Sequence, residues 1–212
     1  GYVHYRCTGA AWSRDGPQGL ALAALTPRPG SSTRRRNRAM GDVMKKYSKQ
    51  DQVTMAAWAA DCAERVLGLF EKAYPADDRP RNAIETCRTW VRTGVFRMSE
   101  IRGASLAAHA AARDAKENNA ACFAARAAGQ AVATAHVPQY AYGAAYYALK
   151  AVAAADPVHT GVNVAREREW QAGHLPEGLR EEVMERIIVL NNIIFAHYSV
   201  GAVLPGNVSD LL

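Results

Sequence analysis

The sequence lacks the short motifs that carry most enzyme chemistry. It contains no glycine-rich nucleotide-binding loop, no P-loop and no His-Glu-x-x-His zinc motif. The nearest approach to a hydrolase nucleophile elbow is at residues 103–107, which lack the final glycine and lie within a predicted helix. These absences argue against the common hydrolase, nucleotide-binding and zinc-peptidase classes.

Cysteine is scarce and poorly spaced for cross-linking. The four cysteines stand at positions 7, 62, 87 and 122, and none forms a Cys-x-x-Cys pair. A zinc site or a disulfide framework needs closer spacing. Cys62, Cys87 and Cys122 fall among alanine, valine and leucine at helical spacing, which predicts buried free thiols.

The chain also lacks convincing strands and membrane spans. No run alternates polar and apolar residues long enough to predict a strand, and residues 187–190 could equally continue a helix. The most apolar long segment, residues 187–204, is interrupted by Asn191, Asn192 and His197. Unpaired amides are costly in lipid, so we expect no membrane partner.

Alanine is abundant in place of these features. It supplies 24 of the 52 residues from 104 to 155. Because alanine is the strongest helix former and loses no rotamer entropy, this region predicts helices that pack closely around little open space. We therefore predict an all-α, alanine-rich bundle of about six to seven helices, which carries no chemistry in its bulk.

The positive charge is concentrated at one end. The net charge is +6, and residues 1–43 contribute +5 of it, largely through Arg34, Arg35, Arg36 and Arg38. We predict a basic, disordered arm over residues 1–43, a helical domain over 44–186, and a tail of uncertain structure over 187–212. The domain is nearly neutral, so nucleic acid would bind only nonspecifically, through the arginine run.

Periodicity, prolines and caps divide the domain into helices. Ser99 is expected to cap the third helix, and Gly94 to end the second. The predicted helices cover about residues 48–74, 80–93, 99–116, 118–137, 138–155, 162–172 and 176–186.

Three polar residues interrupt the predicted core. Asp61, His109 and His136 lie among alanines on helices expected to be mostly buried. A hydrogen-bonded cluster that fixes helix register is the simplest interpretation, since buried polar groups need partners. A metal or proton-transfer site, or a contact with a partner, are the alternatives.

One aromatic residue among charges is a second candidate. Trp170 follows Arg166, Glu167, Arg168 and Glu169. Trp170 with Glu169 could form part of a partner-binding surface, because tryptophan is frequent among interface hot spots. The competing interpretation is that Trp170 anchors its helix to the core.

Several blocks of the sequence together resemble a known family. The Imm-five-like immunity proteins of bacterial toxin–immunity systems share the pattern over about residues 44–186. The most distinctive block runs from Trp58 to Glu85. The other matching blocks are residues 107–113, 124–137, 144–152, 167–171 and 175–176.

The resemblance implies an all-α cytoplasmic protein that binds a cognate toxin protein and neutralises it by occlusion, without catalysis, cofactor or metal. The alternative is a metal-dependent all-α hydrolase or nuclease-related enzyme that uses Asp61, His109 and His136. Two-metal nucleases need clustered carboxylates, whereas the acidic residues here are spread among basic ones.

Overall fold

The computed structural model describes residues 47–198, with side chains described over 47–187. This part of the chain forms seven helices and no strand, which confirms the all-α prediction. The basic arm falls outside the described residues. The helices are α2 (Lys49–Ala73), α3 (Arg79–Thr93), α4 (Met98–Asp114), α5 (Asn119–Ala133), α6 (Tyr140–Ala155), α7 (Thr160–Gly173) and α8 (Glu177–Tyr198).

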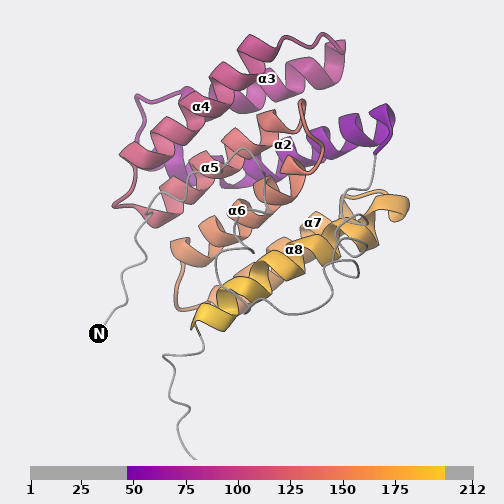
Figure 1. Ribbon diagram of the computed structural model, residues 1–212. Coiled ribbons are helices and arrows are strands. Elements are labelled where there is room, and N and C mark those ends of the chain that lie inside the picture. The colour runs from indigo at the N-terminus through magenta and orange to yellow at the C-terminus, as the bar shows by residue number, and fades with distance from the viewer. Residues whose placement is uncertain (1–46, 199–212) are drawn as a thin grey trace, which may run out of the picture.

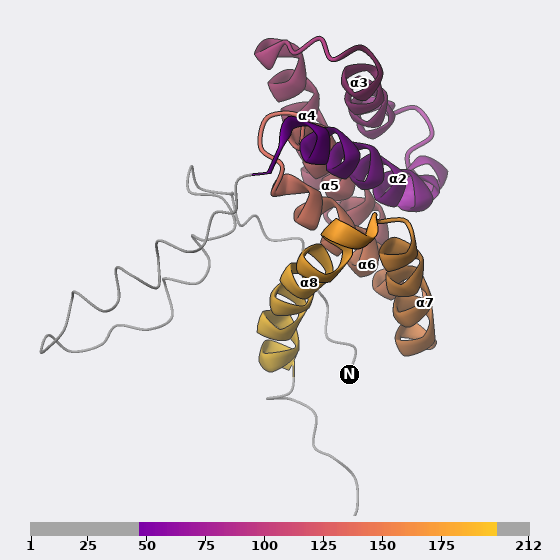
Figure 2. The ribbon, with the colours of Figure 1, turned by 90° about the vertical axis from the view of Figure 1, so that its right-hand side faces the viewer.

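The helices are arranged around α5. This helix packs against α2, α3, α4 and α6, and α6 in turn carries α7 and α8. In Figure 1, α3 and α4 form the upper edge of the molecule, and α7 and α8 form the lower edge. Figure 2 shows the same order after a quarter turn, with α7 and α8 diverging below α6. None of the described helices combines the length and apolar character needed to cross a bilayer.

Local sequence signals set most helix ends. Ser48 forms a capping box with Asp51 at the start of α2. Gly94 ends α3 with a φ of 67°, a left-handed conformation that favours glycine, as predicted. The prediction that Ser99 caps α4 is wrong: the helix begins at Met98 and Arg97 takes the cap position without a side-chain hydrogen bond.

The last helix extends past the predicted end of the domain. Residues 187–190 continue α8, which runs to Tyr198. Leu179, Val183 and Ile187 of α8 are buried at spacings of four residues, so the apolar face continues to Ile187. The predicted division after residue 186 therefore falls inside a helix.

The described cysteines differ in whether they are free or disulfide-bonded. Cys62 and Cys87 are buried and free, as predicted. Burial raises the pKa of the Cys62 thiol well above its usual range and that of Cys87 to about 12, so both are unreactive thiols. Cys122 is buried but disulfide-bonded, so the prediction of a free thiol is wrong there. Cys7 lies outside the described residues.

Small residues allow α5 to lie very close to its neighbours. All twelve residues from Ala121 to Val132 are buried. A Cβ atom added at Gly129 would lie 2.9 Å from Cε1 of His109 on α4. One added at Gly143 of α6 would lie 2.8 Å from Oε1 of Gln130 on α5. Glycine at these two positions therefore sets the separation of α5 from α4 and α6.

A buried polar network fastens α7 to α2. Glu167 is 4% exposed, and its carboxylate accepts hydrogen bonds from Nε of Arg65 at 2.9 and 3.2 Å. The Arg65 Nη2 atom lies 2.8 Å from the same carboxylate. Trp58 Nε1 donates to the Gln171 carbonyl at 2.9 Å, and Gln171 Nε2 donates to the Ala145 carbonyl of α6. These contacts join three helices through the buried side chains of Trp58, Glu167 and Gln171, with Arg65 reaching in from the surface.

Replacement of Glu167 by alanine should destabilise the protein by about 2 kcal/mol, because the buried carboxylate and its pair with Arg65 are lost. The loss is limited because the half-exposed Arg65 regains water. Glu169→Ala is the matched control: Glu169 is exposed on the same helix, and its removal should change the free energy of unfolding by less than about 0.5 kcal/mol. Urea unfolding measures both. Equal losses in the two variants would contradict the network's role.

Gly129→Ala should destabilise the protein by about 1–3 kcal/mol, since the new methyl group would overlap the His109 ring and force it to shift within the α4–α5 contact. Gly103→Ala is its counterpart within α4, where an added Cβ meets nothing within 4 Å. That substitution should stabilise the helix by about 0.5–1 kcal/mol. Thermal and urea unfolding should give opposite signs; a shared sign would mean that the α4–α5 contact is looser than described.

Candidate functional site

Asp61 takes part in surface ion pairs. Its carboxylate lies 2.9 Å from Nη2 of Arg88 on α3, and Arg88 also pairs with Glu64. The side chains of Asp61 and Arg88 are 41% and 38% exposed. Partly solvated pairs of this kind contribute little to stability. Asp61 therefore links α2 to α3 at the surface and is not a core residue.

His109 is the predicted candidate that lies deepest in the structure. Its ring packs against Gly129, and its Nδ1 atom is buried without a hydrogen-bond partner. Burial, reinforced by the positive charges of Arg126 and Arg113, lowers the pKa of His109 to about 4. The imidazole is therefore neutral at pH 7, and its ring serves mainly as a packing group between α4 and α5.

His136 lies at the surface, in the turn after α5. Its ring stacks on Phe96, with centroids 6.4 Å apart and planes inclined by 24°. Phe96 belongs to the connection between α3 and α4, so this contact brings together two turns that are distant in sequence. His136 is thus a neighbour of an exposed aromatic residue.

The three predicted cluster residues contact different neighbours: Arg88 for Asp61, Gly129 for His109 and Phe96 for His136. Over residues 47–187, no three histidine, cysteine, aspartate or glutamate side chains are grouped so that they could hold a metal ion. In the described part of the chain, the three residues are therefore held by separate contacts on different elements.

Trp170 and Glu169 lie at the junction of α7 with α2. The guanidinium of Arg65 lies 4.0 Å from the centre of the Trp170 ring, and His174 stacks on Trp170 at 3.9 Å. Trp170 also packs against the core, whereas Glu169 is exposed. The sequence interpretation overlooked Glu167. Its spacing from Val164 and Gln171 places it on the inward face of α7, which was the available signal.

Exposed apolar side chains gather at the connection between α3 and α4. Val95, Phe96 and Met98 are 57%, 41% and 43% exposed. We call these three residues the α3–α4 apolar edge. They are three exposed apolar residues within four positions, one of them aromatic. The other large apolar residues exposed in the described chain are Leu106 on α4, and Val158 and Val162 around the start of α7. Such clustering is characteristic of interaction surfaces.

A hollow of about 350 Å³ lies beside this edge, between α3 and α4. Val95, Ile101 and Trp90 contribute its apolar lining, and Glu85, Arg97 and Glu100 contribute charge. Trp90 is 1% exposed, and its Nε1 atom is buried without a hydrogen-bond partner. The edge and the hollow therefore bring apolar and charged side chains together, and protein interfaces combine both kinds.

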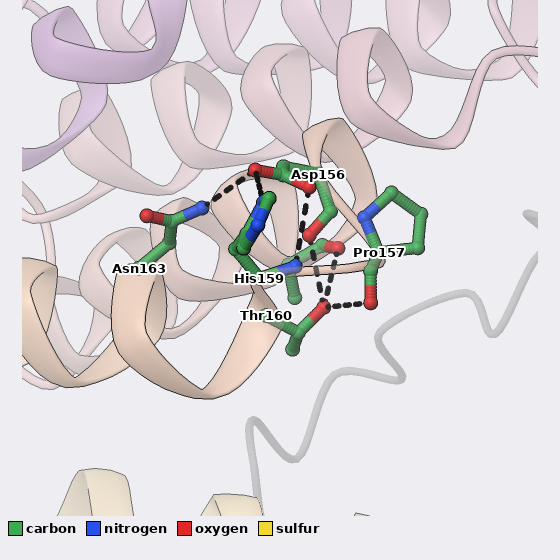
Figure 3. Close-up of polar contacts among 6 residues, drawn as sticks. Asp156, Pro157, His159, Thr160 and Asn163 are labelled. Atoms are coloured by element: carbon green, nitrogen blue, oxygen red, sulfur yellow. Dashed lines mark hydrogen bonds and ion pairs between the residues drawn. The ribbon is translucent and has the colours of Figure 1, made fainter.

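The turn between α6 and α7 offers a useful contrast (Figure 3). Val158 is 85% exposed there, and the residues on either side of it in the sequence make polar contacts with one another. Asp156 accepts from Asn163 Nδ2 at 3.1 Å and pairs with His159 at 2.9 Å, and these contacts with His159 lower the Asp156 pKa. Thr160 Oγ1 donates to carbonyl groups of the turn. This is a self-contained turn with one exposed valine.

The environment of His109 predicts acid sensitivity. Its folded-state pKa of about 4 lies below the usual 6.5, so protonation favours the unfolded chain. The stability contributed by the neutral ring is complete above pH 6.5 and is lost as the pH falls towards 4. Between pH 7.5 and 5 the loss should be about 2 kcal/mol.

Urea unfolding of wild type and His109→Gln at both pH values measures this term, because other groups titrate alike in both proteins. The wild type should lose about 2 kcal/mol more than the variant. Arg102→Gln, at an exposed residue of the same helix that does not titrate in this range, is the control and should lose as much as wild type. Parallel losses in all three proteins would show that His109 is not buried as described.

Comparison with known proteins gives one informative result. No curated protein and no solved structure matches the chain. A family model described as "Imm-5 like putative immunity protein" matches residues 45–178. This stretch covers α2 through α7 and the start of α8, including the α3–α4 apolar edge and the Arg65–Glu167 pair. The chain therefore belongs to the Imm-5-like immunity protein family.

Proposed function

We propose that this protein binds a cognate toxin and neutralises it by occlusion, with the α3–α4 apolar edge at the centre of the contact. Membership of an immunity protein family supports the role in general. The single observation that carries the choice of surface is the clustering of exposed Val95, Phe96 and Met98.

The chemistry of this edge favours a protein partner. Burial of an exposed phenylalanine and its aliphatic neighbours contributes about 25 cal/mol for each Å² of apolar surface removed from water. Aromatic residues at the centre of a contact account for a large share of binding energy. His136 stacks on Phe96 and restricts its motion, which lowers the entropy cost of binding.

The framework behind the edge is suited to a steric role. Trp90 and Ile84 of α3 and Ile101 of α4 are buried, and both helices pack against α5. Binding by a surface held in this way needs little rearrangement. A toxin seated on the edge would be excluded from its target by the bulk of the bundle, so inhibition requires no catalytic group in this protein.

The test uses the toxin encoded beside the gene for this protein. Co-expression followed by co-purification should give a stable complex, and the protein should protect cells that produce the toxin. Phe96→Asp should weaken binding by about thirtyfold or more, the effect of losing a hot-spot residue. Val158→Asp, at the α6–α7 turn, should leave the dissociation constant unchanged.

The folded state of both variants is checked by circular dichroism before binding is measured. Failure of every neighbouring toxin to bind or be neutralised would overturn the proposed function. Equal effects of Phe96→Asp and Val158→Asp would instead reject the α3–α4 apolar edge as the contact surface.

A further inference from the structure

Two cations lie between α5 and α6, and none of the ion pairs in the described part of the chain includes either of them. Arg126 of α5 and Lys150 of α6 are surrounded by the rings of Phe123, Tyr146 and Tyr147. We call these five residues the α5–α6 cation cluster. It lies apart from the residues that form the α3–α4 apolar edge.

Arg126 is an unusual buried charge. The residue is 8% exposed, and among the described residues no carboxylate approaches it within ion-pairing distance. Its one aromatic contact is with Tyr147, whose ring centre lies 5.8 Å from the guanidinium carbon. Arginine is rarely buried unless it is paired, because removal of the charge from water is costly.

Lys150 increases the positive charge at the same place. Its Nζ atom lies 4.1 Å from the centre of the Phe123 ring and 5.7 Å from that of Tyr146. Burial, and next the charge of Arg126, lower the pKa of Lys150 to about 8. The two side chains therefore repel each other in a poorly solvated setting, and an anion between them would relieve both costs.

A hydroxyl group beside the cations is also unsatisfied. Tyr146 is 8% exposed, and its Oη atom is buried without a hydrogen-bond partner. Its neighbour Tyr147 is only partly buried, with the two ring centres 5.4 Å apart, so the cluster reaches the protein surface. An acceptor brought from outside could take the Tyr146 proton in a hydrogen bond.

The buried carboxylate of Glu167 provides a comparison. The residue is 4% exposed and is paired with Arg65. On the neighbouring helix α4, Asp114 is paired with Arg79 and so does not serve the cluster. The α5–α6 cation cluster, in contrast, combines two positive charges, a hydroxyl donor and aromatic walls.

We propose that the α5–α6 cation cluster binds an oxyanion, a carboxylate or phosphate group, held by Arg126 and Lys150 and by the Tyr146 hydroxyl. Arginine binds the oxygen atoms of either group through its planar fork, and a lysine adds a point charge. The oxyanion can be a free ion or an acidic side chain of another protein. This binding does not require the toxin contact, so the two proposals stand or fall separately.

The test follows Lys150 directly. Lysine side chains of the full-length protein are reductively methylated with ¹³C, and the Lys150 resonance is assigned as the one absent from Lys150→Gln. Phosphate and glutarate are titrated against it at constant ionic strength, set with chloride. Saturable shifts are expected, with a rise of about one unit in the pKa of Lys150, because a bound negative charge favours the protonated amine.

Variants separate a site from general screening. Arg126→Gln should abolish the saturable shift, whereas Arg102→Gln, at an exposed arginine of α4, should leave it intact. Saturation by phosphate alone identifies a phosphate site, and saturation by glutarate identifies a site that also accepts carboxylates; each supports the proposal. Shifts that follow ionic strength only, or that persist in Arg126→Gln, would overturn it. Failure of Arg126→Gln to fold would be met by Tyr146→Phe, which should weaken saturation at least threefold.

Discussion

The close approach of α5 to α4 and α6 is the constraint on which the rest of this structure depends. Side chains as small as alanine and glycine line the contacts, and Gly129 and Gly143 bring the backbones within reach of His109 and Gln130. Helices this close leave no space for large internal cavities. The surface of the bundle, and the few polar residues that α5 brings against its neighbours, therefore carry whatever specificity the protein has.

The fold could be predicted because local sequence features determine most of its helices. Alanine content, prolines and the Gly94 stop act within one helix or turn, so seven helices were recognisable along the chain. The errors have physical reasons. Ser99 is a good cap residue, yet α4 begins one residue earlier at Met98. The predicted division after residue 186 falls inside α8, where buried Val183 and Ile187 continue a single apolar face.

The site could be predicted only in part, because it depends on which helices meet. Asp61, His109 and His136 look alike in the sequence as polar residues among alanines. In the structure one is at the surface, one is buried against glycine and one stacks on an aromatic ring. The apolar residues of the α3–α4 connection are visible in the sequence, but their exposure is not. Nor could composition reveal that Arg65 pairs with Glu167, whereas Arg126 forms no ion pair with any acidic residue over 47–187.

The contrast between these two arginines shows how function can be separated from stability in such a bundle. Arg65 and Glu167 neutralise each other, so their interaction acts on the stability of the folded protein. The charges of Arg126 and Lys150 and the hydroxyl of Tyr146 remain available to a group from outside. The exposed Phe96 is available in the same sense, since its ring is only partly covered by His136. Such groups lower the free energy of unfolding. The close packing of the alanine-rich core offsets that cost.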